Sequence, residues 1–333
     1  MVVQGVTGMA GKRQMSMTLT HAAATFLDGR YRHGFIPTNA DNHVSSFASF
    51  SANRGHIWPM TADLCLRWAR EGAAHADPFT WARRLEALRP FSRYLSELDS
   101  ATSFPLGSPF GRKTRRLAPH IYSADEVRRI VEEAGQLMAT PALRPALLST
   151  LFGLLASTGL RISEALALRL ADTDLGHGQL TIKASKFGTS RLVPLHPTTI
   201  QALEAFVSAR GQAVAAGKET HLFSLHGDGR PVPYANVLYA FSRLPVINEI
   251  RPRGGHARVR IHDLRHTFVC RRLMIWLDEG VDIDNAVLAL STYVGHAKPV
   301  STYWYMEAIP ELMALTSARF ERTICVMEEN SHA

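Results

Sequence analysis

Four short stretches in the second half of the chain hold residue types that could carry out a chemical step: TGLRISEAL (158–166), ASKFGTSR (184–191), HDLRHTF (262–268) and VGHAKPVSTYWYM (294–306). They contain arginines, histidines, a lysine and tyrosines. Guanidinium and imidazole N–H groups stabilise charge that grows on phosphate oxygens, a lysine can protonate a leaving oxygen, and a tyrosine can attack as a nucleophile. Together these residue types form the inventory of a phosphoryl transfer that uses no metal ion.

Taken singly, the first two stretches have ordinary explanations as well. Arg161 lies between a helix-ending glycine and a new helix start, where its guanidinium could help to hold an anion near exposed amides. An arginine at such a place is also typical of a surface ion pair. Lys183 and Lys186 flank a predicted hairpin turn, where most lysines are simply solvated.

The third stretch suits either an anion or a metal ion. His262 and Arg265 are three residues apart and would share one face of a helix, so both could contact one phosphate. His262 and His266 are four residues apart, which also suits a metal site. The metalloprotease pattern, however, needs a glutamate where Asp263 stands, so we expect no metal ion here.

The fourth stretch raises the question of which tyrosine, if either, reacts. Aromatic residues near the end of a helical protein are most often packed in the core, which is the ordinary explanation for Tyr303, Trp304 and Tyr305. Consecutive residues of a helix are about 100° apart, so positions 303 and 305 differ by about 200°. The two tyrosines therefore cannot occupy the same place.

Length and charge indicate a folded protein with a polyanionic partner. The 333 residues exceed one typical core and favour two domains. The net charge of +8 and the pI of about 9.7 favour nucleic acid or an anionic membrane as the partner.

Cysteine usage and hydropathy predict a cytoplasmic protein, associated with the nucleoid if it binds DNA. Cys65, Cys270 and Cys325 are far apart and odd in number, which argues against a disulfide framework. The N-terminus lacks the apolar core of a signal peptide. The most apolar run, 146–160, is too short to span a bilayer, so we expect no membrane segment.

Four segments follow one another along the chain. Residues 1–35 lack clear periodicity and are expected to be flexible, whereas 36–102 have apolar residues at helical spacing and predict a helical domain. Residues 103–122 combine prolines, glycines and basic residues, which predicts a linker. Residues 123–333 predict a mainly α-helical domain with one small β-hairpin, because GQLTIKASKFGTSRLVPLHP alternates in a β-type pattern.

Local signals mark several helix ends. Asp77 before Pro78 predicts a helix start, and Ser123 with Glu126 predicts a capping box at the start of the last domain. Gly159 predicts the end of the apolar helix that precedes it.

The linker carries a basic run that has two explanations. Its charges could simply be solvated, or they could follow the phosphate backbone of a nucleic acid. The residues of this run are Arg112, Lys113, Arg115 and Arg116.

The stretches TGLRISEAL, KASKFGTSRLVPL, HDLRHTF and VGHAKPVSTYWY together resemble the ordered motifs of the tyrosine recombinases, the phage integrase family. The resemblance covers roughly residues 120–320. Residues 36–102 resemble the SAM-like core-binding, DNA-binding domain of that family by position and pattern only. The resemblance implies the tyrosine-recombinase catalytic fold, with a C-terminal tail helix, in a two-domain C-shaped clamp.

The resemblance also implies roles for single residues. Arg161 matches the first catalytic arginine, and Glu164 matches the acidic residue that supports it. His262 and Arg265 match the H-x-x-R pair, and His296 matches the second catalytic histidine.

The lysine and the nucleophile are assigned by counting along the same motifs. Lys186, counted back from RLVPL, matches the lysine of the β-hairpin, with Lys183 as the less favoured alternative. The nucleophile of the family typically lies nine residues beyond the second histidine, which selects Tyr305. Tyr303 and Trp304 then keep packing roles.

The function implied is site-specific recombination of DNA, of the integrase or transposase type, for a mobile genetic element. Tyr305 would form a 3′-phosphotyrosyl intermediate, and neither a metal ion, ATP nor another cofactor would be needed. The implied partners are double-stranded DNA, further copies of the chain in a tetramer on paired sites, and accessory recombination proteins.

Two other functions use the same residues. A type IB topoisomerase would relax one duplex as a monomer, and a non-catalytic DNA-binding protein could keep the scaffold without the reaction. One departure from compact family members is the long segment WLDEGVDIDNAVLALS between Arg265 and His296, which predicts an extended helix or loop.

Overall fold

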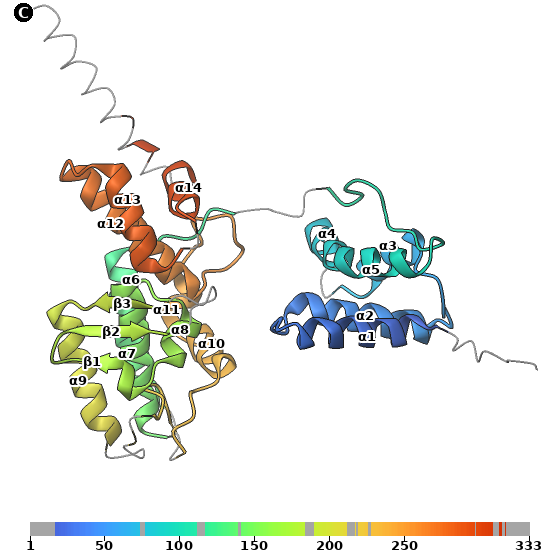
Figure 1. Cartoon of the computed structure of the whole chain (residues 1–333). Coiled ribbons are helices and arrows are strands. Elements are labelled where there is room, and N and C mark those ends of the chain that lie inside the picture. The colour runs from blue at the N-terminus through green and yellow to red at the C-terminus, as the bar shows by residue number, and fades with distance from the viewer. Residues whose placement is uncertain are drawn as a thin grey trace, which may run out of the picture. The chain divides into compact units, whose positions relative to one another are not determined.

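The chain divides into two units, residues 1–116 and 117–333, which are described separately. The computed structural model describes residues 17–73, 77–111, 117–138, 141–183, 190–211, 217, 219–225, 228–296, 298–308, 313–314 and 317. Figure 1 shows both units with their helices and strands labelled.

Helices make up the described part of the first unit. They are α1 (Leu19–Arg32), α2 (Asn39–Asn53), α3 (Ala62–Glu71), α4 (Pro78–Ala87) and α5 (Arg89–Leu98). The side chains of Thr18, Thr61 and Asp77 accept hydrogen bonds from backbone N–H groups at the starts of α1, α3 and α4. The helix start predicted at Asp77 and Pro78 is thereby confirmed.

Trp68 lies at the centre of the first unit and is fully buried. Phe47 of α2 meets it edge to face, with 5.7 Å between the ring centroids. On α4, the Arg84 guanidinium lies 4.2 Å from the Trp68 ring centroid and donates a 3.0 Å hydrogen bond to the Trp68 carbonyl oxygen. One indole therefore joins α2, α3 and α4.

The predicted boundaries of this unit need two corrections. Part of the segment 1–35 expected to be flexible is helix α1, because Leu19, Ala22 and Ala23 are buried in the core of the unit. The predicted linker 103–122 is shorter at both ends: Phe104 packs against the first unit, and Tyr122 is buried in the second.

The described part of the second unit is mainly helical with one small sheet. Its helices are α6 (Ala124–Gly135), α7 (Leu143–Thr158), α8 (Ile162–Ala167), the 3-10 turn η1 (Leu170–Asp172), α9 (Pro197–Gly211), α10 (Tyr234–Ser242), α11 (Pro245–Glu249), α12 (His262–Asp278), α13 (Ile283–Val294) and α14 (Val300–Ala308). The predicted capping box is present at α6, where Ser123 and Glu126 exchange side-chain to backbone hydrogen bonds. The mainly helical fold predicted from the sequence is confirmed.

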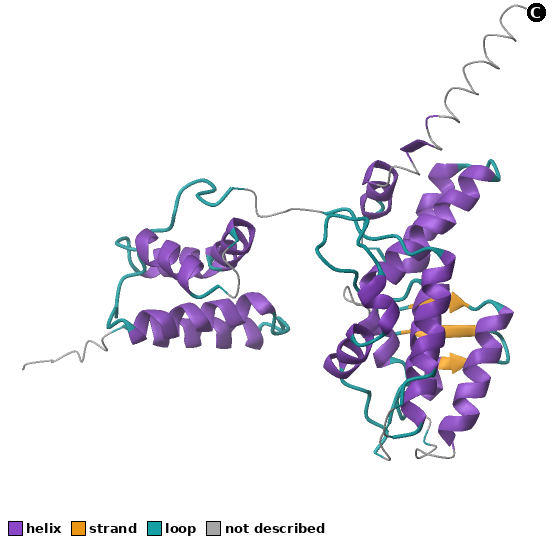
Figure 2. Cartoon of the chain, turned by 180° about the vertical axis from the view of Figure 1, so that it is seen from behind, coloured by secondary structure: helices purple, strands orange, loops and turns teal. Residues whose placement is uncertain are grey.

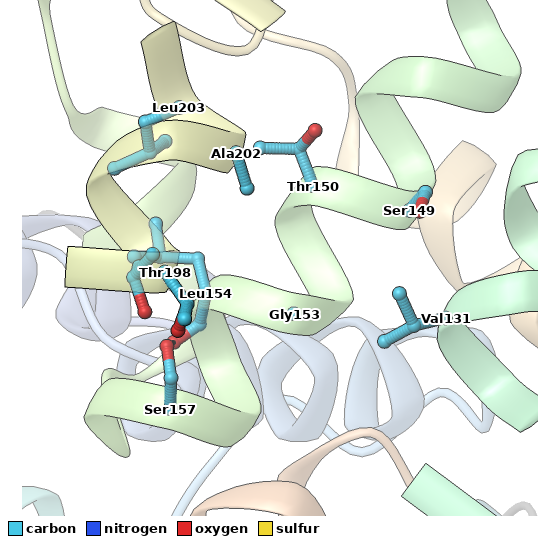
Figure 3. Close-up of a pocket in the computed structure, with 10 residues that line it drawn as sticks. Val131, Ser149, Thr150, Gly153, Leu154, Ser157, Thr198, Ala202 and Leu203 are labelled. Atoms are coloured by element: carbon cyan, nitrogen blue, oxygen red, sulfur yellow. Dashed lines mark hydrogen bonds between the residues drawn. The ribbon is translucent and has the colours of Figure 1, made fainter. Parts of the chain in front are cut away.

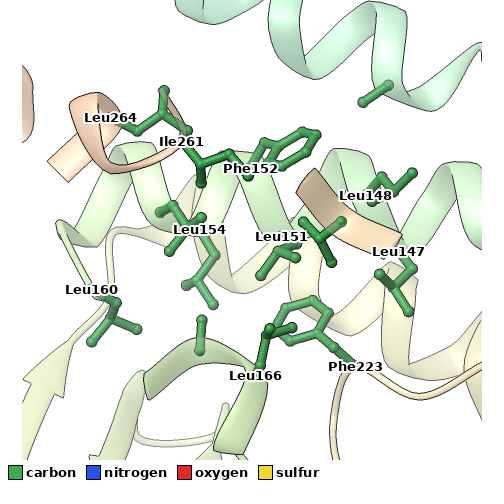
Figure 4. Packing of buried hydrophobic residues seen from close by; sticks show 14 of the residues in the cluster. Leu147, Leu148, Leu151, Phe152, Leu154, Leu160, Leu166, Phe223, Ile261 and Leu264 are labelled. Carbon is green, nitrogen blue, oxygen red and sulfur yellow. The ribbon is translucent and has the colours of Figure 1, made fainter. Parts of the chain in front are cut away.

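Helix α7 forms the centre of the main core, packed against α6, α9 and α12. Figure 4 shows leucines of α7 and its Phe152 packed among side chains that include Leu166 of α8 and Leu264 of α12. Its residues are apolar on nearly every side, as in a helix that is surrounded by protein. The helix ends at Gly159, as predicted, with that glycine in the left-handed conformation at φ +63°.

The sheet contains one strand more than the predicted hairpin. Strands β1 (Thr173–Asp174), β2 (Gln179–Ile182) and β3 (Arg191–Pro194) pair antiparallel in that order. Figure 2 shows this small sheet in orange among the helices of the second unit. In the register, Leu180 pairs with Val193 and Ile182 with Arg191. Strand β1 has only two residues, too few to show an alternating pattern in the sequence.

A second cluster of buried residues joins α12, α13 and α14, and it includes Tyr305. The long segment between Arg265 and His296 folds as the end of α12 and the whole of α13. Most of the predicted tail helix, beyond residue 308, lies outside the described residues. No helix in the described part of the chain is long and apolar enough to cross a membrane.

Substitution of Leu151 by alanine tests the α7 core. The Leu151 side chain is completely buried, so Leu151→Ala should lower the free energy of unfolding by about 2–5 kcal/mol through the cavity it leaves. Leu288→Ala is the control, because 55% of Leu288 is exposed on α13, and it should change stability by less than about 0.5 kcal/mol. Urea unfolding followed by circular dichroism measures both, and equal losses would contradict the assigned core.

Candidate active site

Three arginines converge on the end of helix α13. Gly295 ends this helix in the left-handed conformation, and the last carbonyl groups of a helix have no partner within it. Each of the last three carbonyls accepts a hydrogen bond from an arginine of a different segment. The pairs are Arg191 Nε to Tyr293 O at 2.8 Å, Arg265 Nη2 to Val294 O at 2.7 Å, and Arg161 Nη2 to Gly295 O at 2.8 Å.

The carboxylate of Glu164 joins two of these arginines. Arg161 donates to it through Nη1 at 2.8 Å and through its backbone N–H at 3.0 Å. Arg191 donates to both carboxylate oxygens, at 3.2 and 2.9 Å. Burial raises the pKa of Glu164, but hydrogen bonds from Arg191 and from the Arg161 backbone outweigh that effect, so the pKa lies below its ordinary value. Glu164 is therefore an anion that offsets part of the charge of the two guanidinium groups.

Arg265 is the most buried of the three arginines, with 2% of its surface exposed. Besides the contact with α13, its Nη1 donates to the Gly159 carbonyl oxygen at 2.6 Å. Burial and the neighbouring charge of Arg161 lower its pKa to about 10, so it remains charged at neutral pH. The end of α7, the start of α12 and the end of α13 are thus joined through one guanidinium.

His262 begins α12 and stays neutral at neutral pH. The residue is exposed at the start of the helix, and desolvation by the protein groups packed around the imidazole lowers its pKa. Three neighbouring arginines lower the pKa further, to about 4. They are Arg265, Arg260 and Arg161. The imidazole can therefore accept a hydrogen bond or a proton.

His296 and Tyr305 lie side by side. Their rings are nearly parallel, at 11°, with 6.5 Å between centroids. His296 Nδ1 lies 2.7 Å from the Thr302 hydroxyl oxygen, which fixes the orientation of the imidazole. The turn from Gly295 to α14 therefore places the second predicted histidine against the predicted nucleophile.

The two tyrosines of α14 have different surroundings. Tyr305 is 1% exposed, and its hydroxyl lies 2.6 Å from Nδ1 of His266. Tyr303 is 37% exposed, and its hydroxyl donates to Asp284 of α13 at 2.7 Å. This hydrogen bond raises the pKa of Tyr303. Tyr305 thus lies among the predicted site residues, whereas Tyr303 points towards the exposed side of α13.

Some predicted site residues lie outside the described residues. These are Lys186 and the basic run Arg112, Lys113, Arg115 and Arg116. Lys183, the alternative to Lys186, is described, and its ammonium group forms an ion pair with Asp172 of η1. Lys183 thus pairs with a residue that is not one of the predicted site residues.

Within the described residues, no three His, Cys, Asp or Glu side chains gather in a way that could hold a metal ion. The two histidines with metal-type spacing, His262 and His266, pack edge to face, with 4.6 Å between ring centroids. A surface pocket of about 260 Å³ lies between α6, α7 and α9 (Figure 3). It is lined by residues such as Ser149 and Thr198 and by none of the predicted site residues, so the pocket is separate from the arginine site.

Comparison with known proteins identifies the family of the chain. The phage integrase family matches residues 122–311. The integrase/recombinase y4rB of Sinorhizobium fredii is 32% identical over 310 residues, covering 92% of this chain and 98% of the relative. The chain belongs to the phage integrase family. Tyrosine recombinase XerD of Brucella melitensis is 28% identical over 272 residues, covering 78% of this chain and 79% of the relative.

Solved structures have the same fold. The Tn1549 transposon integrase in complex with circular intermediate DNA matches with a TM-score of 0.61 at 17% identity, covering 92% of this chain and 100% of that one. XerH recombinase bound to difH substrate matches with a TM-score of 0.60 at 17% identity, covering 86% and 81%. The protein is thus a tyrosine recombinase in family and fold, an enzyme that transfers DNA strands.

Two residues of the site were not predicted from the sequence. Arg191 begins strand β3 inside a quoted motif, and only its three hydrogen bonds, two to Glu164 and one to the end of α13, reveal its place. His266 was considered only as a metal ligand, and it contacts Tyr305 instead. The sequence held one signal for Arg191, namely its position as a charged residue at the start of an otherwise apolar strand.

Substitution of Gly295 tests the close approach of Arg191 to the end of α13. A Cβ at position 295 would lie 2.8 Å from Arg191 Nη1 and would stand at φ +69°. Gly295→Ala should therefore lower the free energy of unfolding by about 2–4 kcal/mol, from the backbone strain plus the displaced guanidinium. Gly280→Ala is the matched control, because Gly280 has φ +75° but an added Cβ there would have no atom within 4 Å. This substitution should lower the free energy of unfolding by only about 1 kcal/mol. Equal losses in urea unfolding would show that the guanidinium moves freely.

The charge of Glu164 should appear in the pH dependence of stability. Glu164→Gln leaves two partly buried guanidinium groups without the buried carboxylate between them and should lower the free energy of unfolding by about 3 kcal/mol at pH 7. Because the folded-state pKa lies below the ordinary value of 4.5, the carboxylate contribution is complete above that value. It is lost as the pH falls through the folded-state pKa, so the two proteins should converge in acid. Glu132→Gln, at an exposed ion pair, is the control and should differ little at any pH.

Proposed function

We propose that the protein is a site-specific DNA recombinase that cuts and rejoins DNA through a 3′-phosphotyrosyl intermediate on Tyr305. Membership in the phage integrase family supports DNA as the substrate. The observation that carries the proposal is the meeting of Arg161, Arg265, His262 and His296 with the Tyr305 side chain around the end of α13.

The arginines supply the charge that such a reaction needs. In phosphoryl transfer, negative charge spreads over the non-bridging oxygens, and preorganised donors stabilise it. Arg161 and Arg265 are each held by backbone carbonyls, so no reorganisation is needed when a phosphate enters. His296, oriented by Thr302, would add a further donor. The site can therefore hold a phosphodiester without a metal ion supplying the charge.

The remaining steps are assigned to Tyr305 and Lys186. The Tyr305 oxygen would attack phosphorus, and Lys186 would give a proton to the departing 5′-oxygen. The covalent link conserves the energy of the phosphodiester, so ATP is not needed to rejoin the strands. A 5′-hydroxyl of a second duplex would then reverse the attack.

The proposed partners follow from the same function. Recombination joins two duplexes and requires four protomers, so the chain would assemble as a tetramer on paired sites, with accessory proteins where the site demands them. The first unit and the basic run around Arg115 would contact the DNA backbone. The tail beyond α14 would help to join the protomers. The sequence TYWY and the long segment before His296 favour recombination of a mobile element.

A covalent-trapping assay tests the nucleophile. A nicked duplex that carries the cognate site should give a covalent adduct with wild type on a denaturing gel, with a chelator present throughout. Tyr305→Phe should give no adduct, because the attacking oxygen is gone. Tyr303→Phe is the matched control and should react at close to the wild-type rate, since the Tyr303 hydroxyl donates to an exposed aspartate of α13.

Each outcome of this assay has a distinct meaning. An adduct lost only in Tyr303→Phe would overturn the assignment of the nucleophile. An adduct that depends on added metal would overturn the metal-free mechanism. If the wild-type protein binds the duplex but forms no adduct, the protein is a non-catalytic DNA-binding protein. Relaxation of supercoiled DNA without joining of two duplexes would indicate a topoisomerase.

A phosphate in the site should raise the pKa of His262. In the free protein that pKa is about 4, partly because of three arginines whose charges a bound phosphate would offset. Addition of the duplex to Tyr305→Phe should move the titration of His262 upward, towards the ordinary histidine range. NMR of labelled histidines measures this, with the resonance assigned through His262→Gln and exposed His177 as the internal control. An unchanged His262 pKa in the bound state would contradict phosphate binding between these arginines.

A further inference from the structure

The hydroxyl of Tyr305 is in contact with a histidine that lies outside the set implied by the family motifs. The Tyr305 oxygen lies 2.6 Å from Nδ1 of His266, and the two rings are 5.5 Å apart at their centroids. His262 packs edge-on against His266, with 4.6 Å between centroids. The imidazole in contact with the tyrosine oxygen is therefore that of His266.

We infer that His266 orients the Tyr305 hydroxyl and takes its proton as the oxygen attacks DNA. This inference rests on the proposed function and adds a proton acceptor to it. Nδ1 can accept from the hydroxyl when the neutral imidazole carries its own proton on Nε2.

The step balances in atoms and charge. The bond from the Tyr305 oxygen to phosphorus forms while the bond from phosphorus to the 5′-oxygen breaks. The phenolic proton passes to His266 Nδ1, which becomes imidazolium, and the leaving 5′-oxygen takes its proton from Lys186. Imidazole is a weaker base than phenolate, so the proton moves as the new bond forms and not before it. Rejoining returns both protons along the same paths.

The helix that carries His266 is held firmly in place. Arg265, the preceding residue, is bound at both ends of its guanidinium, to α7 and to α13. Thr267, the following residue, donates to the Asp263 carbonyl and accepts from the Tyr122 backbone N–H. A base for catalysis must lie at a fixed place relative to the reacting oxygen, and these contacts fix the backbone on both sides of His266.

Ionisable groups from several elements surround the His266–Tyr305 pair. On α12 they are His262 and Arg265, and before α14 His296 stacks against the Tyr305 ring. The pH dependence of the reaction therefore contains several titrations. The contribution of His266 has to be isolated as a difference between wild type and a variant.

The experiment compares wild type with His266→Asn in single-turnover adduct formation across pH. Asparagine can place a hydrogen-bonding atom near the former Nδ1 but cannot take a proton. The rate at pH 7 should fall by about 10²–10⁴-fold, the range typical of a lost acid or base. Above neutral pH the deficit should shrink, because hydroxide replaces the missing base. His177→Asn is the control, since His177 is exposed on the β1–β2 turn, and its rate should match wild type at every pH.

A DNA substrate with a sulfur leaving group distinguishes a general base from a general acid. With a bridging 5′-phosphorothiolate duplex, the departing thiolate needs no proton. Lys186→Ala should then recover most of its activity, whereas His266→Asn should keep its deficit, because the tyrosine proton must still be removed. Recovery of His266→Asn on the sulfur substrate would overturn the assignment and make His266 an acid.

The remaining outcomes also decide the matter. A deficit that is constant across pH would mean that His266 only positions the tyrosine, and a wild-type rate would mean that it does neither. If His266→Asn binds the duplex more weakly or unfolds at a lower temperature, His266→Gln is measured in its place. Absence of any adduct from wild type would instead refute the proposed function, so the two failures are distinguishable.

Discussion

The C-terminal end of helix α13 is the point on which the rest of the site depends. Guanidinium groups brought together in a protein repel one another and lose their hydration. Here three of them, Arg161, Arg191 and Arg265, find carbonyl oxygens that the helix leaves unpaired and that carry its partial negative charge. The carboxylate of Glu164 supplies a full negative charge between two of them. A strongly basic site can therefore exist in the protein before any substrate arrives.

This arrangement explains why the site needs nearly the whole second unit. The arginines come from the start of α8, from β3 and from α12, while the carbonyls belong to α13. The apolar core around α7 holds these elements together, and the carbonyl of Gly159 at the end of α7 contacts Arg265 directly. Tyr305 lies in a second apolar cluster, which is formed by α12, α13 and α14. The arginines and the proposed nucleophile thus belong to neighbouring cores that meet along α12.

The sequence predicted helix starts and ends correctly where the residues that cause them lie next to one another in the chain. The capping box of Ser123 and Glu126, the start at Asp77 and the end at Gly159 all depend on residues within one turn of a helix. Helix α1 was missed because two of its three buried residues are alanines, which give a weak periodic signal, although Leu19 and both alanines are buried in the first core. Strand β1 was missed because two residues carry no pattern.

The sequence by itself determined the family, through the residue types and the order of the four motifs. The choice between Tyr303 and Tyr305 could be framed from the sequence alone, because two residues of helix place these rings on opposite sides. Only the tertiary structure decided which groups meet: Arg191 with Glu164, 27 residues away, and His266 with Tyr305, 39 residues away. Such contacts arise from the packing of helices around apolar cores. No periodicity in the chain records them, because the energy that holds them comes from burial between elements and not from their neighbours in sequence.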